Sequence, residues 1–187
     1  MHTKSAFKIA KKGNVLKKLF LFCMYFILLH TSLFADIENC AKFKEFFNDK
    51  SVAIIGNAQS LFDYELGDEI DSHDIVIRMN SGMIQKSISQ GSKTTIWASS
   101  FPLKENVVNN EFNPKYIFWI TPKLSVKPLY SISFHKKMFM LPFNVWEELF
   151  KNLDETRPTT GLSIIYFLLE HCLTHFLSFC YYQDLNV

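Results

Sequence analysis

The chain has 187 residues, of which 48% are hydrophobic and 16% are aromatic, including 19 Phe. This composition excludes a disordered chain, and the length suffices for one domain with an appendage. Six of the 20 basic residues precede Asp36, the first acidic residue, so the remaining 14 are outnumbered by the 18 acidic residues. A mildly acidic body offers no electrostatic surface for nucleic acid, and we expect no such partner.

The N-terminus combines a basic head at residues 1–18 with an uncharged apolar run at 19–35. A run of about 17 residues is at the short limit for a membrane-spanning helix. A cleaved signal peptide requires small residues at positions −3 and −1 of the cut, where Ala35 is suitable and Leu33 is not. We favour an uncleaved signal-anchor, which keeps the head in the cytoplasm. The body then lies on the non-cytoplasmic side of a single-pass membrane protein, in the Golgi lumen if the host is eukaryotic; a secreted or periplasmic protein is the alternative.

Residues 36–187 alternate between predicted strands and predicted helices. Short apolar runs that end in Gly or polar residues are typical of buried strands, and amphipathic spacing is typical of helices. The expected strands are 51–56, 74–80, 94–100, 115–121 and 137–142. The expected helices are 37–47, 144–153 with Asn144 as its cap, and 159–172. Such alternation predicts a single α/β domain built on a layered sheet.

Two strand ends carry groups that suit a ligand. Gly56 and Asn57 follow the first strand, and the second strand ends in Arg78, Met79 and Asn80. Ligands of open α/β sheets bind beyond the carboxyl ends of the strands. Glycine permits close backbone approach, and asparagine supplies both a donor and an acceptor. Each feature alone also fits an ordinary turn or strand end; together they indicate a nucleotide site.

The same stretch resembles the large sialylmotif of the sialyltransferases, which are of the glycosyltransferase family 29 type. The matching segments are "GNAQSL", "GDEIDSHD", "VIRMN" and "GSKTTI", which follow one another in the family's order over about fifty residues. Further on, "RPTTGLSIIYFLL" resembles the small sialylmotif. Several different motifs that occur in the family's order are more specific than a single dinucleotide fingerprint.

The resemblance implies a Rossmann-like nucleotide-binding sheet with helices on both faces, a variant of the GT-A type of glycosyltransferase fold. It implies an inverting, metal-independent transfer of sialic acid from CMP-sialic acid to a galactose-terminated or other glycan acceptor, with no cofactor. The positions that match donor-binding residues of the family are Gly56, Asn57, Ser60, Asn80, Thr159, Thr160 and Gly161. Ser60 stands where many members have Asn. A helix that starts at Gly161 also offers its positive end to an anion.

The segment around Asp71, His73 and Asp74 could suggest a metal site or an acid–base pair. In the family this segment is mainly structural, and we adopt that interpretation. The chain has no Asp-x-Asp sequence, which fits a monophosphate leaving group and a site without metal.

Two departures from the family pattern affect the prediction. Ser51 replaces the Cys that usually pairs with a Cys of the small motif, so we expect no bridge to Cys172. The histidine that acts as general base belongs to a later motif of the family, and the tail up to Val187 contains no match to it. We therefore expect this base to lie beyond Val187, with the C-terminal part of the domain missing. The alternatives are a non-catalytic, membrane-anchored remnant that binds sugar nucleotides and an unrelated Rossmann-type binding protein.

Overall fold

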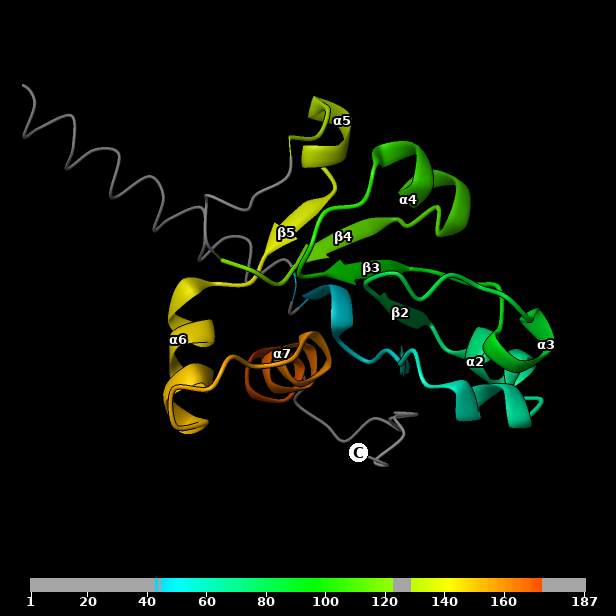
Figure 1. Ribbon diagram of the computed structural model, residues 1–187, viewed down its shortest axis with the longest axis horizontal. Helices are drawn as coiled ribbons and strands as arrows, with labels where there is room; N and C mark the ends of the chain where they lie inside the picture. Colours follow the sequence, from blue (N-terminus) through cyan, green and yellow to red (C-terminus); the bar gives the residue numbers. More distant parts are fainter. Residues whose placement is uncertain (1–42, 44, 123–128, 173–187) are drawn as a thin grey trace, which may run out of the picture. The chain divides into compact units, whose positions relative to one another are not determined.

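The computed structural model describes residues 43, 45–122 and 129–172 (Figure 1). The chain divides into two units, Met1–Lys42 and Phe43–Val187, and all described residues belong to the second. The basic head, the predicted membrane segment and most of the expected helix 37–47 lie outside the described residues. Across the described ranges, no helix is long and apolar enough to cross a membrane.

Five parallel strands form one sheet, in which each strand pairs with the strand before it in the chain. The strands are β1 (Val52–Ile55), β2 (Ile75–Met79), β3 (Ile96–Ser99), β4 (Tyr116–Trp119) and β5 (Met138–Met140). The residues of β1, β2 and β3 are all buried, as expected for parallel strands that are covered on both faces. The predicted α/β sheet is confirmed, and every predicted strand is present.

The helical elements between the strands and after β5 are short. They are η1 (Gln59–Asp63), α2 (Gly67–Ser72), α3 (Ser87–Gln90), α4 (Glu105–Glu111), α5 (Ile132–His135), α6 (Phe143–Asn152), α7 (Thr160–Phe167) and the π-helix η3 (Leu168–Cys172). Helix α6 begins directly after Pro142, and no side chain caps it, so the prediction that Asn144 is its cap is wrong. Proline fixes the backbone for a helix entry at that point, which places Asn144 inside the first turn.

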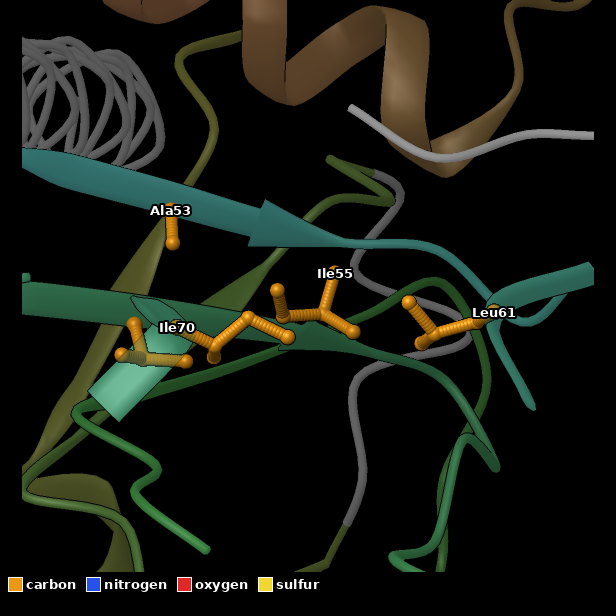
Figure 2. Close-up of a cluster of buried hydrophobic side chains, with 5 residues drawn as sticks. Ala53, Ile55, Leu61 and Ile70 are labelled. Carbon is orange, nitrogen blue, oxygen red and sulfur yellow. The ribbon is translucent and has the colours of Figure 1, made fainter. Parts of the chain in front are cut away.

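One face of the sheet packs against the elements that connect the strands. Strand order 1-2-3-4-5 with right-handed crossovers brings the connections to the same side. On this face Ala53 and Ile55 of β1 pack against Leu61 of η1 and Ile70 of α2, as Figure 2 shows. Further along the sheet, the buried residues of this face and its covering helices are Trp97, Val108, Phe112, Ile117 and Phe134.

The opposite face is covered by α7 and by the segment that precedes β1. Phe118 of β4 points to this face because its neighbour Ile117 points to the other. The ring of Phe118 lies 5.1 Å from that of Phe167 in α7 and 5.3 Å from that of Phe43. Figure 1 accordingly shows α7 and α4 on opposite sides of the strands. This packing fixes the start of α7 near the carboxyl ends of β2 and β3.

Candidate functional site

Polar side chains from three separate segments meet at the carboxyl edge of the sheet. Asn80 follows β2, Ser100 follows β3, and Thr160 is the first residue of α7. The Asn80 side-chain amide donates to Thr160 Oγ1 at 3.3 Å, and Thr160 Oγ1 donates to Ser100 Oγ at 3.0 Å. Two of the positions that match donor-binding residues of the family, Asn80 and Thr160, are therefore in contact, although 80 residues separate them in the chain.

The orientation of the Asn80 amide follows from its neighbours. The backbone N–H of Ser100 points at Asn80 Oδ1 at 3.2 Å, and the Ser99 hydroxyl lies 3.3 Å from the same atom. Because a backbone N–H can only donate, the atom that faces it must be the amide oxygen. The NH₂ group is consequently turned toward Thr160, where it can donate to a second acceptor as well.

Asn80 also adopts an unusual backbone conformation, with φ of 53°. Asparagine tolerates this left-handed region better than most residues. Its backbone N–H donates to the Ala98 carbonyl at 2.8 Å, and its own carbonyl accepts from Trp97 Nε1 at 2.7 Å. Strand β3 therefore binds both the backbone N–H and the carbonyl of Asn80, and this fixes the Asn80 side chain in place.

Asn57 reaches the same edge from β1. Its side chain is exposed, and its amide donates to the Met79 carbonyl at 3.3 Å. A Cβ atom added to Gly82 would lie 2.0 Å from Asn57 Oδ1. Gly82 therefore leaves the space that the Asn57 amide occupies against the loop after β2. Asn57 and Asn80 lie at one edge of the sheet, as predicted.

The remaining predicted donor residues lie on the elements that border this edge. Gly56 is buried and directly follows β1 in the chain, and Ser60 is a half-buried residue of η1. The Thr159 hydroxyl accepts from the Leu162 N–H at 3.2 Å, so Thr159 is the cap of α7. Helix α7 thus begins at Thr160, within one residue of the expected start, and Gly161 lies buried in its first turn. Unpaired N–H groups of such a turn attract an anion. Donor binding by these residues stays a prediction.

The structure gives Asp71 a folding role. Its carboxylate accepts hydrogen bonds from the Ser92 N–H at 2.8 Å and from the Lys93 N–H at 2.9 Å. Burial opposes ionisation of Asp71, but these bonds and the charge of Arg78 hold its pKa below the usual value. Gly91, with φ of 67°, makes the approach possible, since a Cβ there would lie 2.4 Å from Asp71 Oδ1. The structural interpretation of this segment is confirmed for Asp71.

Asp74 and His73 also complete the fold at the start of β2. Asp74 accepts from both the backbone N–H and the hydroxyl of Ser51, each at 2.9 Å. These bonds lower the pKa of Asp74. The His73 ring bonds to the Glu69 carbonyl at 2.9 Å through Nδ1. Ser51, which stands where the family usually has Cys, is thus used to bind Asp74.

Sequence reasoning missed three residues of this edge, Ser99, Ser100 and Gly82. The two serines end the strand "IWAS" and its following turn, so the rule that singled out Asn57 and Asn80 applied to them equally. Gly82 gave no comparable signal, because its role depends on which side chain occupies the space beside it.

No group of three or more His, Cys, Asp or Glu residues that could hold a metal occurs in the described part of the chain. His73 lies just before β2, and His135 is the last residue of α5, which precedes β5. Both therefore lie toward the amino ends of the strands, away from Asn80.

The comparison with known proteins covers the segment from Gly56 to Ile96 that resembles the large sialylmotif. Residues 28–102 match the family described as Glycosyltransferase family 29 (sialyltransferase). The chain resembles the sialyltransferase family. A mouse sialyltransferase, CMP-N-acetylneuraminate-beta-galactosamide-alpha-2,3-sialyltransferase 1, is 29% identical over 143 residues, which are 64% of this chain and 41% of the mouse protein. The human type 2 lactosamine alpha-2,3-sialyltransferase is 26% identical over 116 residues, 55% of this chain and 35% of that protein. The chain thus spans less than half the length of these sialyltransferases.

Solved sialyltransferase structures share the fold. The crystal structure of a mammalian sialyltransferase superimposes with a TM-score of 0.53 at 19% identity, over 75% of this chain and 61% of that one. A mammalian sialyltransferase in complex with Gal-beta-1-3GalNAc-ortho-nitrophenol gives a TM-score of 0.52, also at 19% identity, over 74% and 61%. At this identity the likeness establishes the fold alone. The predicted resemblance and the glycosyltransferase-type fold are both confirmed.

Proposed function

We propose that this chain is a glycosyltransferase that transfers sialic acid from CMP-sialic acid to a glycan acceptor. The observation that carries the proposal is the hydrogen-bonded group of Asn80, Ser100 and Thr160, with Asn57 beside it. It lies at the sheet edge where nucleotides bind in α/β folds, and its asparagines and Thr160 belong to the sialylmotif-like segments. The mouse relative's name specifies CMP-N-acetylneuraminate as its donor, which supports the same donor here.

The chemistry of this edge suits a cytidine monophosphate. The Asn80 NH₂ group and the first turn of α7 both present N–H donors, which match the oxygen acceptors of a phosphate or a pyrimidine. A monophosphate leaving group carries less charge than a diphosphate, so hydrogen bonds and a helix end can stabilise it without a divalent ion. We accordingly propose a metal-independent reaction that uses no cofactor.

In the proposed reaction an acceptor hydroxyl attacks the anomeric carbon of sialic acid in line with the bond to CMP. The new glycosidic bond forms as the bond to the phosphate breaks, with inversion, and the hydroxyl proton passes to a general base. A galactose-terminated glycan is the proposed acceptor. A mammalian sialyltransferase that shares the fold has been solved in complex with Gal-beta-1-3GalNAc-ortho-nitrophenol, which supports this class of acceptor.

Transfer of sialic acid needs a general base, whereas donor binding does not. The resemblance assigns it to a histidine of a later motif, and these 187 residues contain no match to that motif. His73 and His135 lie toward the opposite edge of the sheet. Since a positioned base contributes roughly 10²–10⁴-fold, we propose that this chain binds the donor but transfers sialic acid poorly. A non-catalytic membrane-anchored protein that binds sugar nucleotides is the second candidate, favoured by the placement of His73 and His135.

We further propose that residues 19–35 anchor the chain and that the domain lies on the non-cytoplasmic side, in the Golgi lumen of a eukaryotic host. The cluster of six lysines before this segment supports that orientation. Protease added to sealed vesicles should leave the domain intact. Digestion from the cytoplasmic side would contradict the orientation.

The donor site is tested by calorimetric titration with CMP together with transfer of labelled sialic acid to galactose-terminated acceptors. Asn80→Ala should abolish measurable CMP binding, because it removes the amide that joins β2 to α7. Asn113→Ala is the matched control, since Asn113 also has a left-handed backbone, with φ of 41°, but precedes β4 at the far edge. Absence of CMP binding by the native chain would contradict the proposed donor. Efficient turnover would contradict the proposed lack of a base.

A further inference from the structure

The loop from Asn80 to Gln90, whose last turn is the helix α3, carries two residues of the site. Asn80 begins the loop, and Gly82 provides the space in which the Asn57 amide rests. Asn80 is held by β3, so a change in the course of this loop would chiefly alter the space beside Gly82 in which the Asn57 amide lies. What fixes the loop is consequently relevant to donor binding.

The far end of the loop is anchored by Arg78, a buried residue of β2. The Arg78 side chain lies on the face of the sheet between Ile55 and Trp97, its partners on the neighbouring strands. Its Nη2 donates to the Gln90 carbonyl at 2.7 Å, and its Nε donates to the Lys93 carbonyl at 3.1 Å. The strand that leads into Asn80 thus also binds the backbone at which the loop ends.

The charge on Arg78 persists at neutral pH. Burial lowers the pKa of its guanidinium to about 10, while the nearby carboxylate of Asp71 raises it. The two hydrogen bonds to backbone carbonyls are therefore charge-assisted, which makes them stronger than neutral ones. Gln90 is held firmly at its backbone.

The side chain of Gln90 reaches back into the loop. It is 7% exposed, and its Oε1 accepts from the Gln85 N–H at 2.7 Å and from the Lys86 N–H at 3.0 Å. A single carboxamide oxygen thus joins the middle of the loop to its anchored end. Without it, two backbone donors in the loop would lose their partner.

We propose that Gln90 is a positioning residue of the donor site, which closes the loop from Asn80 to Gln90 and thereby sets the place of Gly82 and the Asn57 amide. This inference rests on the proposed donor binding at Asn57 and Asn80. Gln90 forms its hydrogen bonds with Arg78, Gln85 and Lys86 and with neither asparagine, so its effect is transmitted by the loop.

The test compares Gln90→Met with Gln90→Glu in the full chain. Methionine fills a similar volume without an acceptor oxygen, whereas a glutamate carboxylate keeps the acceptor for both N–H groups. Gln85→Met is the control, because the Gln85 side chain is exposed and only its backbone N–H takes part. Arg78 is left unchanged, since removing a buried charge would endanger the whole fold.

Two readouts are needed. Hydrogen exchange at the amides of residues 85 and 86 reports closure of the loop, and titration with CMP reports the site. Gln90→Met should speed exchange at both amides and weaken CMP binding roughly tenfold, the ratio that corresponds to about one net hydrogen bond. Gln90→Glu should restore both values, and Gln85→Met should change neither.

The outcomes separate loop closure from donor binding. Unchanged exchange in Gln90→Met would overturn the role of Gln90 in closing the loop. Faster exchange with native CMP affinity would overturn its role in positioning the site. A native chain that does not bind CMP at all would refute the proposed donor, and with it the link from the loop to donor binding, while the exchange data would still report closure.

Discussion

The two edges of the sheet use their polar residues differently. At the amino edge, the carboxylates of Asp71 and Asp74 accept several hydrogen bonds from segments that precede β1 and β3. At the carboxyl edge, Asn80 and Thr160 are neutral groups joined to each other, and Asn57 is exposed. Charged groups at one edge therefore complete the fold, while neutral donors and acceptors at the other remain able to bind a ligand. Asp71, Asp74, Asn57 and Asn80 all belong to the stretch that resembles the large sialylmotif, whereas Thr160 comes from the later segment.

The largest effect on stability should come from Asp71→Ala at the amino edge. The change removes hydrogen bonds to Ser92 and Lys93 and takes away the carboxylate nearest to buried Arg78. We expect the free energy of unfolding to fall by about 2–4 kcal/mol, because bonds to a charged group contribute more than neutral ones. Denaturant titration measures this loss. Asp68 is an exposed acid on the same helix, and Asp68→Ala should lower the free energy of unfolding far less. Equal losses in the two variants would contradict the structural role of the amino-edge carboxylates.

A smaller effect on stability, but a larger one on binding, should follow from Thr160→Val. Valine keeps the shape but loses the hydroxyl that bonds Asn80 and Ser100. The expected loss is about 1 kcal/mol of unfolding free energy and roughly tenfold in CMP affinity. Thr95→Val is the matched variant of the amino edge, where the Thr95 hydroxyl accepts from the Val76 N–H at 3.1 Å. It should lower stability alone, and an equal loss of CMP affinity would show that the two edges are not separate.

The smallest expected difference is a pH dependence that belongs to the amino edge. The pKa of Asp71 is lower in the folded chain than its ordinary value of 3.8. This carboxylate therefore stabilises the fold above pH 3.8, and its contribution is lost as the pH falls through the folded pKa. The difference in unfolding free energy between the native chain and Asp71→Asn should therefore be constant near neutral pH and shrink as the pH falls below about 4, through the folded pKa. The corresponding difference for Thr160→Val should stay constant, because neither Thr160 nor Asn80 titrates.

Much of the sheet was predictable because each strand is a short apolar run that ends in Gly or a polar residue. The same logic placed Asn57 and Asn80 at one edge, since parallel strands end together. The prediction that Asn144 caps α6 was wrong because Pro142 fixes the backbone for a helix start two residues earlier. Arg78 looked like a strand-end residue, yet it is buried, and Gln90 gave no signal at all. Their roles depend on how a loop returns beneath its own strand, which spacing along the chain does not encode.

The order of the strands has a consequence for how the chain folds. Since every strand pairs with its predecessor, most of the sheet needs contacts of short sequence separation, and such contacts form quickly. The sheet can therefore assemble progressively as the chain emerges during synthesis. The contact between Asn80 and Thr160 spans 80 residues and has to wait for α7. We expect the carboxyl edge of the sheet to be the last part of this domain to form.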